Sequence, residues 1–353
     1  MKEGLLDSAT STVSWLRWLL RWTTVLLLVY VTIDAVDLNA SMRKPLSPED
    51  TKAILSGKRY FIAALLKDNE SIMANWTREL LKTINSLGDD NVFVSIVENG
   101  DSRDGTRRHL DNLKASLKEQ SIRHSIIVEE VVQRNDKDRI ELLSELRNKA
   151  IEPLYSMTKW DPKMTRVLFL NDIWFKSTDL LELLITNRGE YDIACALDFY
   201  VRFYDSWVTR DLTGSEIRPS FPYFNDATAK EQQRHGKPVR VFSCWNGVAV
   251  LQAEPFFKKV AFRTSSASQI YHSECFWICY DFWKAGYNRV LINPNVNVAY
   301  NQWFYHMHNT IYSKIIHPLQ AALSWIVSRY EPNADSLPSN NFPATAEQWQ
   351  SYR

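Results

Sequence analysis

The stretch RYFIAALLKDNESIMANWTRELLKTINSL (59–87) decides the fold. It begins with an apolar run at 60–66 that favours a strand, passes through the polar break KDNE (67–70), and continues as a helical stretch at 71–86. A strand that leads directly into a helix is the first half of a β-α-β unit, and such units build mostly parallel sheets. The stretch therefore predicts an α/β domain that starts at this strand.

The same alternation runs through the first half of the chain. Further strands are predicted at 92–97, 125–128 and 166–170, and further helices at 106–119 and 139–154. The second half is less regular, with strands predicted at 193–197, 239–242, 247–251 and 289–292 and a helix at 274–285. Together these elements predict one α/β domain at 58–300. The C-terminal part, 301–353, is predicted to hold a helix at 311–330 and a loosely ordered tail.

Composition narrows the class of protein. The 353 residues carry a net charge of +1 and are 45% hydrophobic and 24% charged, which is typical of a folded domain. This charge balance offers no basic surface for nucleic acid, so no nucleic-acid partner is expected. Flat aromatic faces are typical of sugar-binding sites, and the 13 Trp, 15 Tyr and 16 Phe supply them, although most large aromatics fill protein cores.

An apolar stretch at 13–36 is about as long as a transmembrane anchor helix needs to be. Arg17 and Arg21 interrupt it, so spanning requires both side chains to reach the cytosolic headgroups. The basic residues Lys2, Arg17 and Arg21 lie on its amino side and the acidic residues Asp34 and Asp37 at its carboxyl end, which predicts a cytosolic tail at 1–12 and, after a stem at 37–57, a lumenal body. The alternatives are a helix that lies on the membrane surface and a cleaved signal peptide.

Three N-x-S/T sequons, at Asn39, Asn69 and Asn75, agree with a lumenal body in the endoplasmic reticulum or Golgi, and Asn39 and Asn75 are predicted to carry glycans. The four cysteines are too few for a disulfide scaffold, and they lack the paired spacing of a zinc site. One disulfide that involves Cys244 and a set of buried thiols both remain open.

Polar groups follow the first two predicted strands, at the sheet edge where open α/β folds bind nucleotides. Lys67 and Glu70 come after the first strand, and Glu98, Asn99 and Gly100 come after the second. All five are predicted to bind a nucleotide-bearing donor substrate, and the last three are nearest to base or ribose. The alternative is ordinary turn and capping chemistry.

The run RVLFLNDI (166–173) delivers Asn171 and Asp172 from a buried strand to the same edge. A departing diphosphate needs its charge neutralised, and a divalent cation held by carboxylate oxygen does this. Asp172 is therefore the predicted ligand of Mn or Mg, and Asn171 is predicted to contact the donor. The alternative for Asp172 is a turn or a helix cap. Arg147, before this strand, is predicted to bind diphosphate oxygens, and an exposed salt bridge is the competing account.

Asp198 and Asp205 stand among aromatic residues, which is unusual for a merely solvated surface. Asp198 is assigned to donor hydroxyls and Asp205 to the catalytic groups, although the spacing does not fix this order. Tyr204, Trp207 and Asp211 are predicted to lie on the acceptor side.

The turn SCWNG (243–247) combines a large ring, Trp245, with an amide, Asn246, which suits the binding of an acceptor sugar hydroxyl. A structural turn with a buried Trp245 is the alternative. Glu274 opens a predicted helix and is the third catalytic candidate, beside Asp172 and Asp205. It could also cap its helix or only orient substrate hydroxyls.

The chain resembles the fungal α-1,3-mannosyltransferases linked to cryptococcal capsule formation, glycosyltransferase family 69, in six segments: FLNDIWF (169–175), YDIACALDFY (191–200), FYDSWVTRDLTG (203–214), SCWNGVAV (243–250), SEC (273–275) and NPNVNVAY (293–300). The resemblance implies a GT-A, Rossmann-like, metal-dependent transferase that moves mannose from GDP-mannose with retention of configuration. It also implies a single-pass Golgi-type membrane enzyme in which Asp172 is the metal-site carboxylate.

The sequence departs from the expected pattern in FLNDIWF, where Trp174 stands in place of a smaller aliphatic residue. The acceptor could therefore be a glycan, a glycolipid or a metabolite. Two alternatives to this function stay open: transfer from another nucleotide sugar, and a non-catalytic accessory protein of glycan synthesis.

Overall fold

The structure is a computed structural model that describes residues 17, 18, 21–23, 46–133, 136–267, 269–317 and 319. Residues 46–308 of this set belong to one compact unit, and the remaining described residues belong to a second. Most of the predicted anchor at 13–36, Asn39 and the end of the predicted C-terminal helix lie outside the described residues. In the described part of the chain, no helix is both long enough and apolar enough to cross a bilayer.

An eight-stranded sheet forms the centre of the main unit, in the order β3-β2-β1-β4-β7-β5-β8-β6. Its strands are β1 (Arg59–Leu65), β2 (Val92–Val97), β3 (Arg123–Ile127), β4 (Thr165–Leu170), β5 (Ile193–Phe199), β6 (Val239–Arg240), β7 (Val248–Gln252) and β8 (Val290–Ala299). The strands β1 to β4, β5 and β8 run parallel, and β6 and β7 run against them. The predicted mixed, mostly parallel sheet is confirmed. Six strands therefore end at one edge, and β7 begins there.

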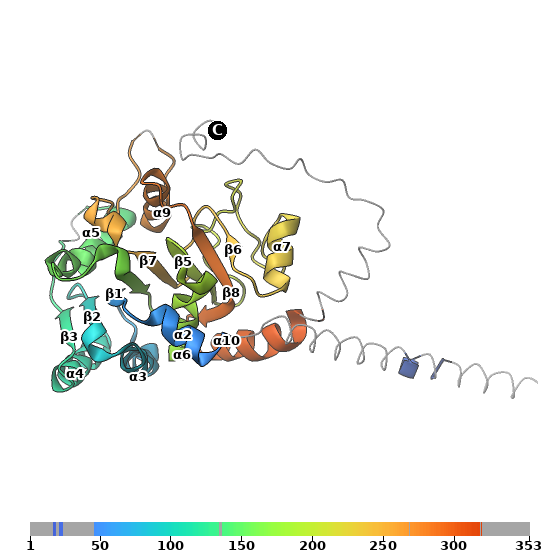
Figure 1. Cartoon of the computed structure of the whole chain (residues 1–353), viewed down its shortest axis with the longest axis horizontal. Coiled ribbons are helices and arrows are strands. Elements are labelled where there is room, and N and C mark those ends of the chain that lie inside the picture. The colour runs from blue at the N-terminus through green and yellow to red at the C-terminus, as the bar shows by residue number, and fades with distance from the viewer. Residues whose placement is uncertain are drawn as a thin grey trace, which may run out of the picture. The chain divides into compact units, whose positions relative to one another are not determined.

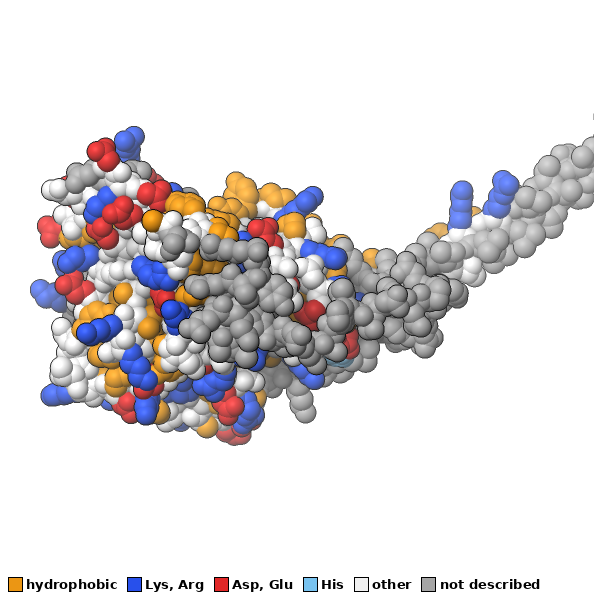
Figure 2. Space-filling view, turned by 90° about the horizontal axis from the view of Figure 1, so that it is seen from above, with side chains coloured by type: hydrophobic (Ala, Val, Ile, Leu, Met, Phe, Trp, Pro, Cys, Tyr) orange, Lys and Arg blue, Asp and Glu red, His pale blue; other side chains and the backbone are white. Residues whose placement is uncertain are grey.

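Helices cover both faces of this sheet (Figure 1). They are α2 (Pro48–Leu55), α3 (Glu70–Leu87), α4 (Thr106–Glu119), α5 (Arg139–Ile151), α6 (Ser177–Leu184), α7 (Ala227–Arg234), α8 (Glu254–Phe257), α9 (Glu274–Lys284) and α10 (Gln302–His306). Alternate strand residues enter opposite cores: Phe61 packs on the face of α5 and α9, and Ile62 packs on the face of α3, α4 and α6. On the face shown in Figure 2, acidic and basic side chains are interspersed over the body.

Several predicted boundaries moved for identifiable reasons. The helix predicted to reach residue 154 ends at Ile151, because Pro153 lacks the backbone N–H that the helix needs. The strand predicted at 289–292 continues to Ala299, since a register shift opposite Cys195 and Leu197 lets β8 continue past Pro294. The described part of the C-terminal helix predicted from residue 311 overlaps a π-helical stretch at Met307–Ile316.

The four cysteines divide evenly between the two possibilities. Cys195 and Cys244 form a disulfide that joins β5 to the turn before β7. Cys275 and Cys279 are buried thiols.

Asn75 is a correction to the glycosylation prediction. Its side chain lies in α3 and only 3% of the residue is exposed. The amide Nδ2 donates to the carbonyl of Phe175 at 2.9 Å. A glycan on this nitrogen would break that bond and find no room, so the prediction for Asn75 is wrong.

Candidate active site

The candidate site lies at the sheet edge where β1, β4 and β5 end and β7 begins. Leu170 pairs with Val248, which places the residues after β4 beside the turn before β7. The backbone N–H of Asn171 donates to the carbonyl of Gly247 at 2.9 Å and extends this contact by one residue. Segments far apart in the sequence therefore meet at this edge.

The loop after β1 is fastened to the loop after β2. Glu70 accepts hydrogen bonds from the Gly105 N–H at 2.9 Å and from the Arg108 guanidinium at 3.0 Å. Lys67, which is about half exposed, pairs with Asp101. Both side chains therefore join the two loops. The predicted contacts of Lys67 and Glu70 with the donor stay predictions.

The second predicted donor group is occupied more fully. Glu98 is completely buried and accepts from the backbone of Asp101 and Ser102 at 3.0 and 2.8 Å and from Arg107 Nε at 3.0 Å. Its carboxylate holds the loop together and is not available to base or ribose. The prediction that Glu98 contacts the donor directly is therefore wrong.

Asn99 has the same structural role. Its Oδ1 accepts from the N–H groups of Val131 and Val132, each at 3.0 Å, and its Nδ2 donates to the Val132 carbonyl at 2.8 Å. The amide is therefore not free for a nucleotide, which is a second correction. Gly100 has a structural reason to be glycine: its φ is 78°, and a Cβ there would lie 2.7 Å from the backbone nitrogen of Glu130. Its contact with the donor stays a prediction.

Asp172 is the carboxylate that the site leaves most open. It is partly exposed, and its Oδ2 accepts one hydrogen bond, at 3.1 Å, from Asn69 Nδ2. Among the described residues, no Lys, Arg or His lies within ion-pair distance of it. Burial raises the pKa of Asp172, while the Asn69 bond and the Arg147 charge oppose that rise.

Arg147 and Glu274 form a buried ion pair beside Asp172. Arg147 Nε donates to Glu274 Oε1 at 2.8 Å, and the two side chains are 8% and 2% exposed. The guanidinium also lies 4.8 Å from the Phe169 ring centroid and 4.7 Å from that of Trp245. The salt bridge of Arg147 is buried, so the exposed salt bridge offered as the alternative is wrong. The predicted contact of Arg147 with diphosphate oxygens stays a prediction, although its Nε is engaged with Glu274.

A second acidic group lies at the end of β5. The Asp205 N–H donates to Asp198 Oδ1 at 3.1 Å, and the Tyr300 hydroxyl donates to Asp198 Oδ2 at 2.8 Å. Burial raises the pKa of both carboxyls, and their proximity raises it further for Asp198. The negative charge of Glu274 also raises the pKa of Asp205, whereas Arg147 lowers it. The two acidic groups therefore form one electrostatic cluster.

The prediction that Trp245 and Asn246 bind the acceptor is wrong. They are 2% and 0% exposed, so neither offers a surface to an acceptor. Asn246 accepts from the Thr209 hydroxyl at 2.7 Å and donates to the Ala196 carbonyl at 2.8 Å. Its backbone N–H donates to Asp205 Oδ2 at 3.2 Å. The turn at 243–247 therefore supports the site by holding the Asp205 carboxylate in place.

The other predicted acceptor residues differ in exposure. Tyr204 and Trp207 are 60% and 39% exposed beside Asp205, and their acceptor role stays a prediction. Asp211 is buried and its Oδ1 accepts from the N–H groups of Thr213 and Ser215 at 2.8 and 3.0 Å, so it closes a turn and contacts no acceptor.

Sequence reasoning missed two residues that hold the acidic groups, Asn69 and Tyr300. Asn69 and Tyr300 lie inside quoted motifs, KDNE and NPNVNVAY, but no spacing rule links them to Asp172 or Asp198. Within the described residues, no three His, Cys, Asp or Glu side chains gather in an arrangement that would hold a metal ion.

The sequence model of a family described as Cryptococcal mannosyltransferase 1 matches residues 59–281. The chain belongs to this family. It is 29% identical over 271 residues to the alpha-1,3-mannosyltransferase CMT1 of Cryptococcus neoformans, across 69% of this chain and 58% of that protein. The match thus spans little more than half of that relative's length.

Two solved structures show a looser likeness. The mannosyltransferase PcManGT from Pyrobaculum calidifontis, in complex with GDP-Man and Mn²⁺, has a TM-score of 0.42 and 14% identity, over 93% of this chain and 90% of that one. Glucosyl-3-phosphoglycerate synthase from Mycobacterium tuberculosis has a TM-score of 0.40 and 12% identity, over 83% and 87%. Likeness at this level leaves the function to be argued from the family and the site.

Proposed function

We propose that this member of the family is an α-1,3-mannosyltransferase of the GT-A type that transfers mannose from GDP-mannose. The observation that carries this is the position of Asp172: a partly exposed carboxylate just after β4, within reach of the charge of Arg147, which pairs with Glu274 and also acts on Asp205. All four residues fall inside the matched region, 59–281.

Asp172 suits a divalent cation such as Mn or Mg. It offers carboxylate oxygen to a hard ion, and its one side-chain hydrogen bond, from Asn69, leaves coordinating capacity free. Since no three His, Cys, Asp or Glu side chains gather in a metal-binding arrangement among the described residues, the donor phosphates and water would complete the coordination. When bound, the cation neutralises charge on the departing diphosphate.

Other residues of the chain help to keep the Asp172 carboxylate ionised. The Arg147 charge favours the ionised form of Asp172 against the effect of burial. The Arg147 guanidinium is itself held by Glu274 and packs against the rings of Phe169 and Trp245, so its position is fixed before substrate arrives.

Asp205 is the carboxylate best placed to meet a sugar hydroxyl. It is partly exposed, and the backbone of Asn246 holds one of its oxygens. Its raised pKa makes it a stronger proton acceptor than an ordinary surface carboxylate. Tyr204 and Trp207, its neighbours along the chain, carry exposed rings that suit contact with an acceptor, whether glycan, glycolipid or metabolite.

The proposed setting is the membrane of the Golgi or endoplasmic reticulum, with a catalytic domain at 58–300 in the lumen and an anchor at 13–36. Its support is the charge pattern around that apolar stretch.

A donor screen tests this function. The full-length chain, purified in detergent, is incubated with Mn²⁺, a panel of glycan, glycolipid and metabolite acceptors, and GDP-mannose, UDP-glucose, UDP-galactose or GDP-fucose, and the released nucleotide is measured. Transfer of mannose alone, into an α-1,3 linkage found by methylation analysis, is expected. Release of nucleotide from a UDP-sugar only would show that GDP-mannose is not the donor. Folded protein that releases nucleotide from no donor, yet binds glycan, would support the non-catalytic accessory protein and contradict the proposed enzyme.

A further inference from the structure

The indole of Trp76 lies against the chain just where it leaves β4. Trp76 is completely buried in α3. Its Nε1 donates to the backbone carbonyl of Asn171 at 3.0 Å, and its ring meets that of Phe175 edge-on at 6.3 Å. One side chain therefore contacts the chain on both sides of Asp172.

The sheet no longer holds the backbone at this point. The ladders that join β4 to its neighbours β1 and β7 both end at Leu170. Beyond it, the Asn171 N–H donates to Gly247, and the Asn171 carbonyl accepts from Trp76. The indole thus supplies, from a helix, the hydrogen bond that a neighbouring strand would otherwise supply.

Asn171 is held from the opposite side as well. Its Oδ1 accepts from Trp245 Nε1 at 3.1 Å, and Arg147 Nη1 lies 3.4 Å away. The side-chain oxygen is therefore engaged within the protein, and the predicted contact of Asn171 with the donor stays a prediction.

We infer that Trp76 is a positioning residue for the proposed transfer reaction, because it fixes the peptide plane that carries the Asp172 carboxylate. The Asn171 carbonyl and the Asp172 N–H belong to one planar peptide unit. A hydrogen bond to that carbonyl fixes the orientation of the plane and with it the direction in which Asp172 leaves the backbone. This inference rests on the proposed function, in which Asp172 binds the cation.

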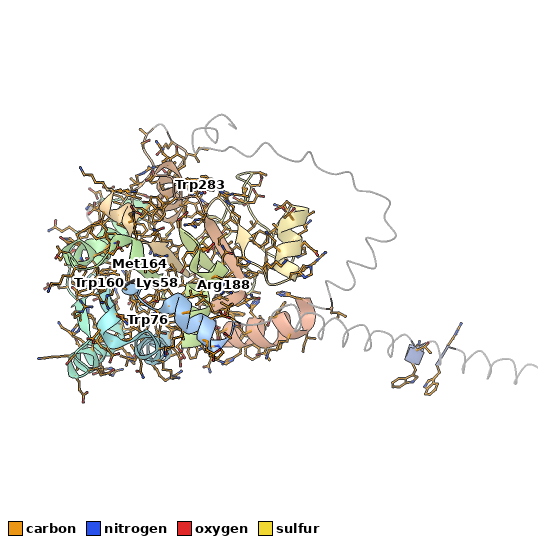
Figure 3. The ribbon with its side chains drawn as sticks, viewed as in Figure 1. Lys58, Trp76, Trp160, Met164, Arg188 and Trp283 are labelled. Atoms are coloured by element: carbon orange, nitrogen blue, oxygen red, sulfur yellow. A yellow bond between two sulfur atoms is a disulfide. The ribbon has the colours of Figure 1, made fainter. Side chains whose placement is uncertain are left out.

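A buried indole needs a partner for its N–H in any protein, so the bond alone does not separate positioning from packing. Trp283 provides the matched control. Its Nε1 also donates to a backbone carbonyl, that of Phe242, at 2.9 Å. Figure 3 shows Trp76 and Trp283 well apart, on α3 and α9, so Trp283→Phe removes the same kind of bond without touching the Trp76 contact to Asn171.

The experiment compares Trp76→Phe with Trp283→Phe and with Leu80→Ala. Leu80 is fully buried in the same helix α3, so its truncation weakens that helix without removing the indole bond. For each full-length variant, melting temperature is measured first. The affinity for Mn²⁺ in the presence of GDP is then measured from the free-ion electron paramagnetic resonance signal, and kcat and KM for GDP-mannose are measured separately.

Trp76→Phe should weaken Mn²⁺ binding and lower kcat/KM by about 10- to 100-fold, as the loss of a residue behind a metal ligand typically does. Trp283→Phe and Leu80→Ala should stay within about twofold of wild type. Equal effects in Trp76→Phe and Leu80→Ala at equal loss of melting temperature would overturn the positioning role.

The inference and the proposed function fail in different ways. If wild type binds Mn²⁺ with GDP but transfers no mannose, the transferase proposal fails, and the Mn²⁺ affinity of Trp76→Phe still decides the positioning role. If wild type transfers mannose and Trp76→Phe matches Trp283→Phe, only the positioning role fails. Wild type that binds no Mn²⁺ with any nucleotide would overturn both.

Discussion

Replacement of Arg147 by methionine tests how much the site depends on its buried ion pair. Methionine keeps much of the length and the contact with Phe169 and Trp245, but it leaves the Glu274 carboxylate buried without its cation. Removal of one partner from a buried pair typically destabilises a protein by about 3–5 kcal/mol, because an uncompensated charge remains. For a domain of this size the melting temperature should fall by roughly 6–20 °C.

Two further variants make this measurement specific. Arg108→Met breaks the exposed pair with Glu70, whose side chains are 71% and 43% exposed, and should cost about 0–1 kcal/mol. Arg147→Met combined with Glu274→Gln removes the stranded charge and should recover part of the lost stability. Urea unfolding of the full-length variants gives these differences. An Arg147→Met loss no larger than that of Arg108→Met would refute the account of a dry, fixed ion pair.

Three more perturbations have defined outcomes. Burial raises the pKa of Asp198 and Asp205 above the unfolded value, so the native state holds their protons more tightly and stability should fall as pH rises from about 4 through neutrality. Asp198→Asn should make stability depend less on pH, as measured by urea unfolding at pH 5 and 8. An unchanged dependence would count against the buried pair. Cys244→Ser opens a disulfide that spans 49 residues and should lower the free energy of unfolding by about 4 kcal/mol, whereas an unchanged urea midpoint would show that the bridge is absent. Thr77→Ala destroys the sequon at Asn75 and should leave the mass of the glycosylated protein otherwise unchanged, because that amide is buried; loss of one glycan would contradict this.

Local patterns were sufficient for the framework. The apolar run at 60–66 and the helix after it are β1 and α3, because strand and helix periods are properties of neighbouring residues. The position of Asp172 was predictable for the same reason: a buried strand that ends in a carboxylate places it at the sheet edge.

Contacts between distant segments were not predictable from those patterns. Arg147 and Glu274 are 127 residues apart, and Asp198 and Tyr300 are 102 apart, yet each pair forms a hydrogen bond. Polarity in a loop also does not show whether a side chain points outward or back to the backbone. Glu98 therefore looked like a ligand for a nucleotide although it holds its own loop together.

The central claim is that Asp172 holds the cation on which mannose transfer depends. The most direct measurement is the initial rate of transfer from GDP-mannose by full-length protein, first in excess chelator and then with Mn²⁺ added back, for wild type, Asp172→Asn and Asp226→Asn. Asp226 caps α7, where asparagine caps equally well, so this control should behave as wild type. Wild type should regain its rate with Mn²⁺, and Asp172→Asn should stay inactive at an unchanged melting temperature. Full wild-type transfer in chelator, or an active Asp172→Asn, would contradict the account.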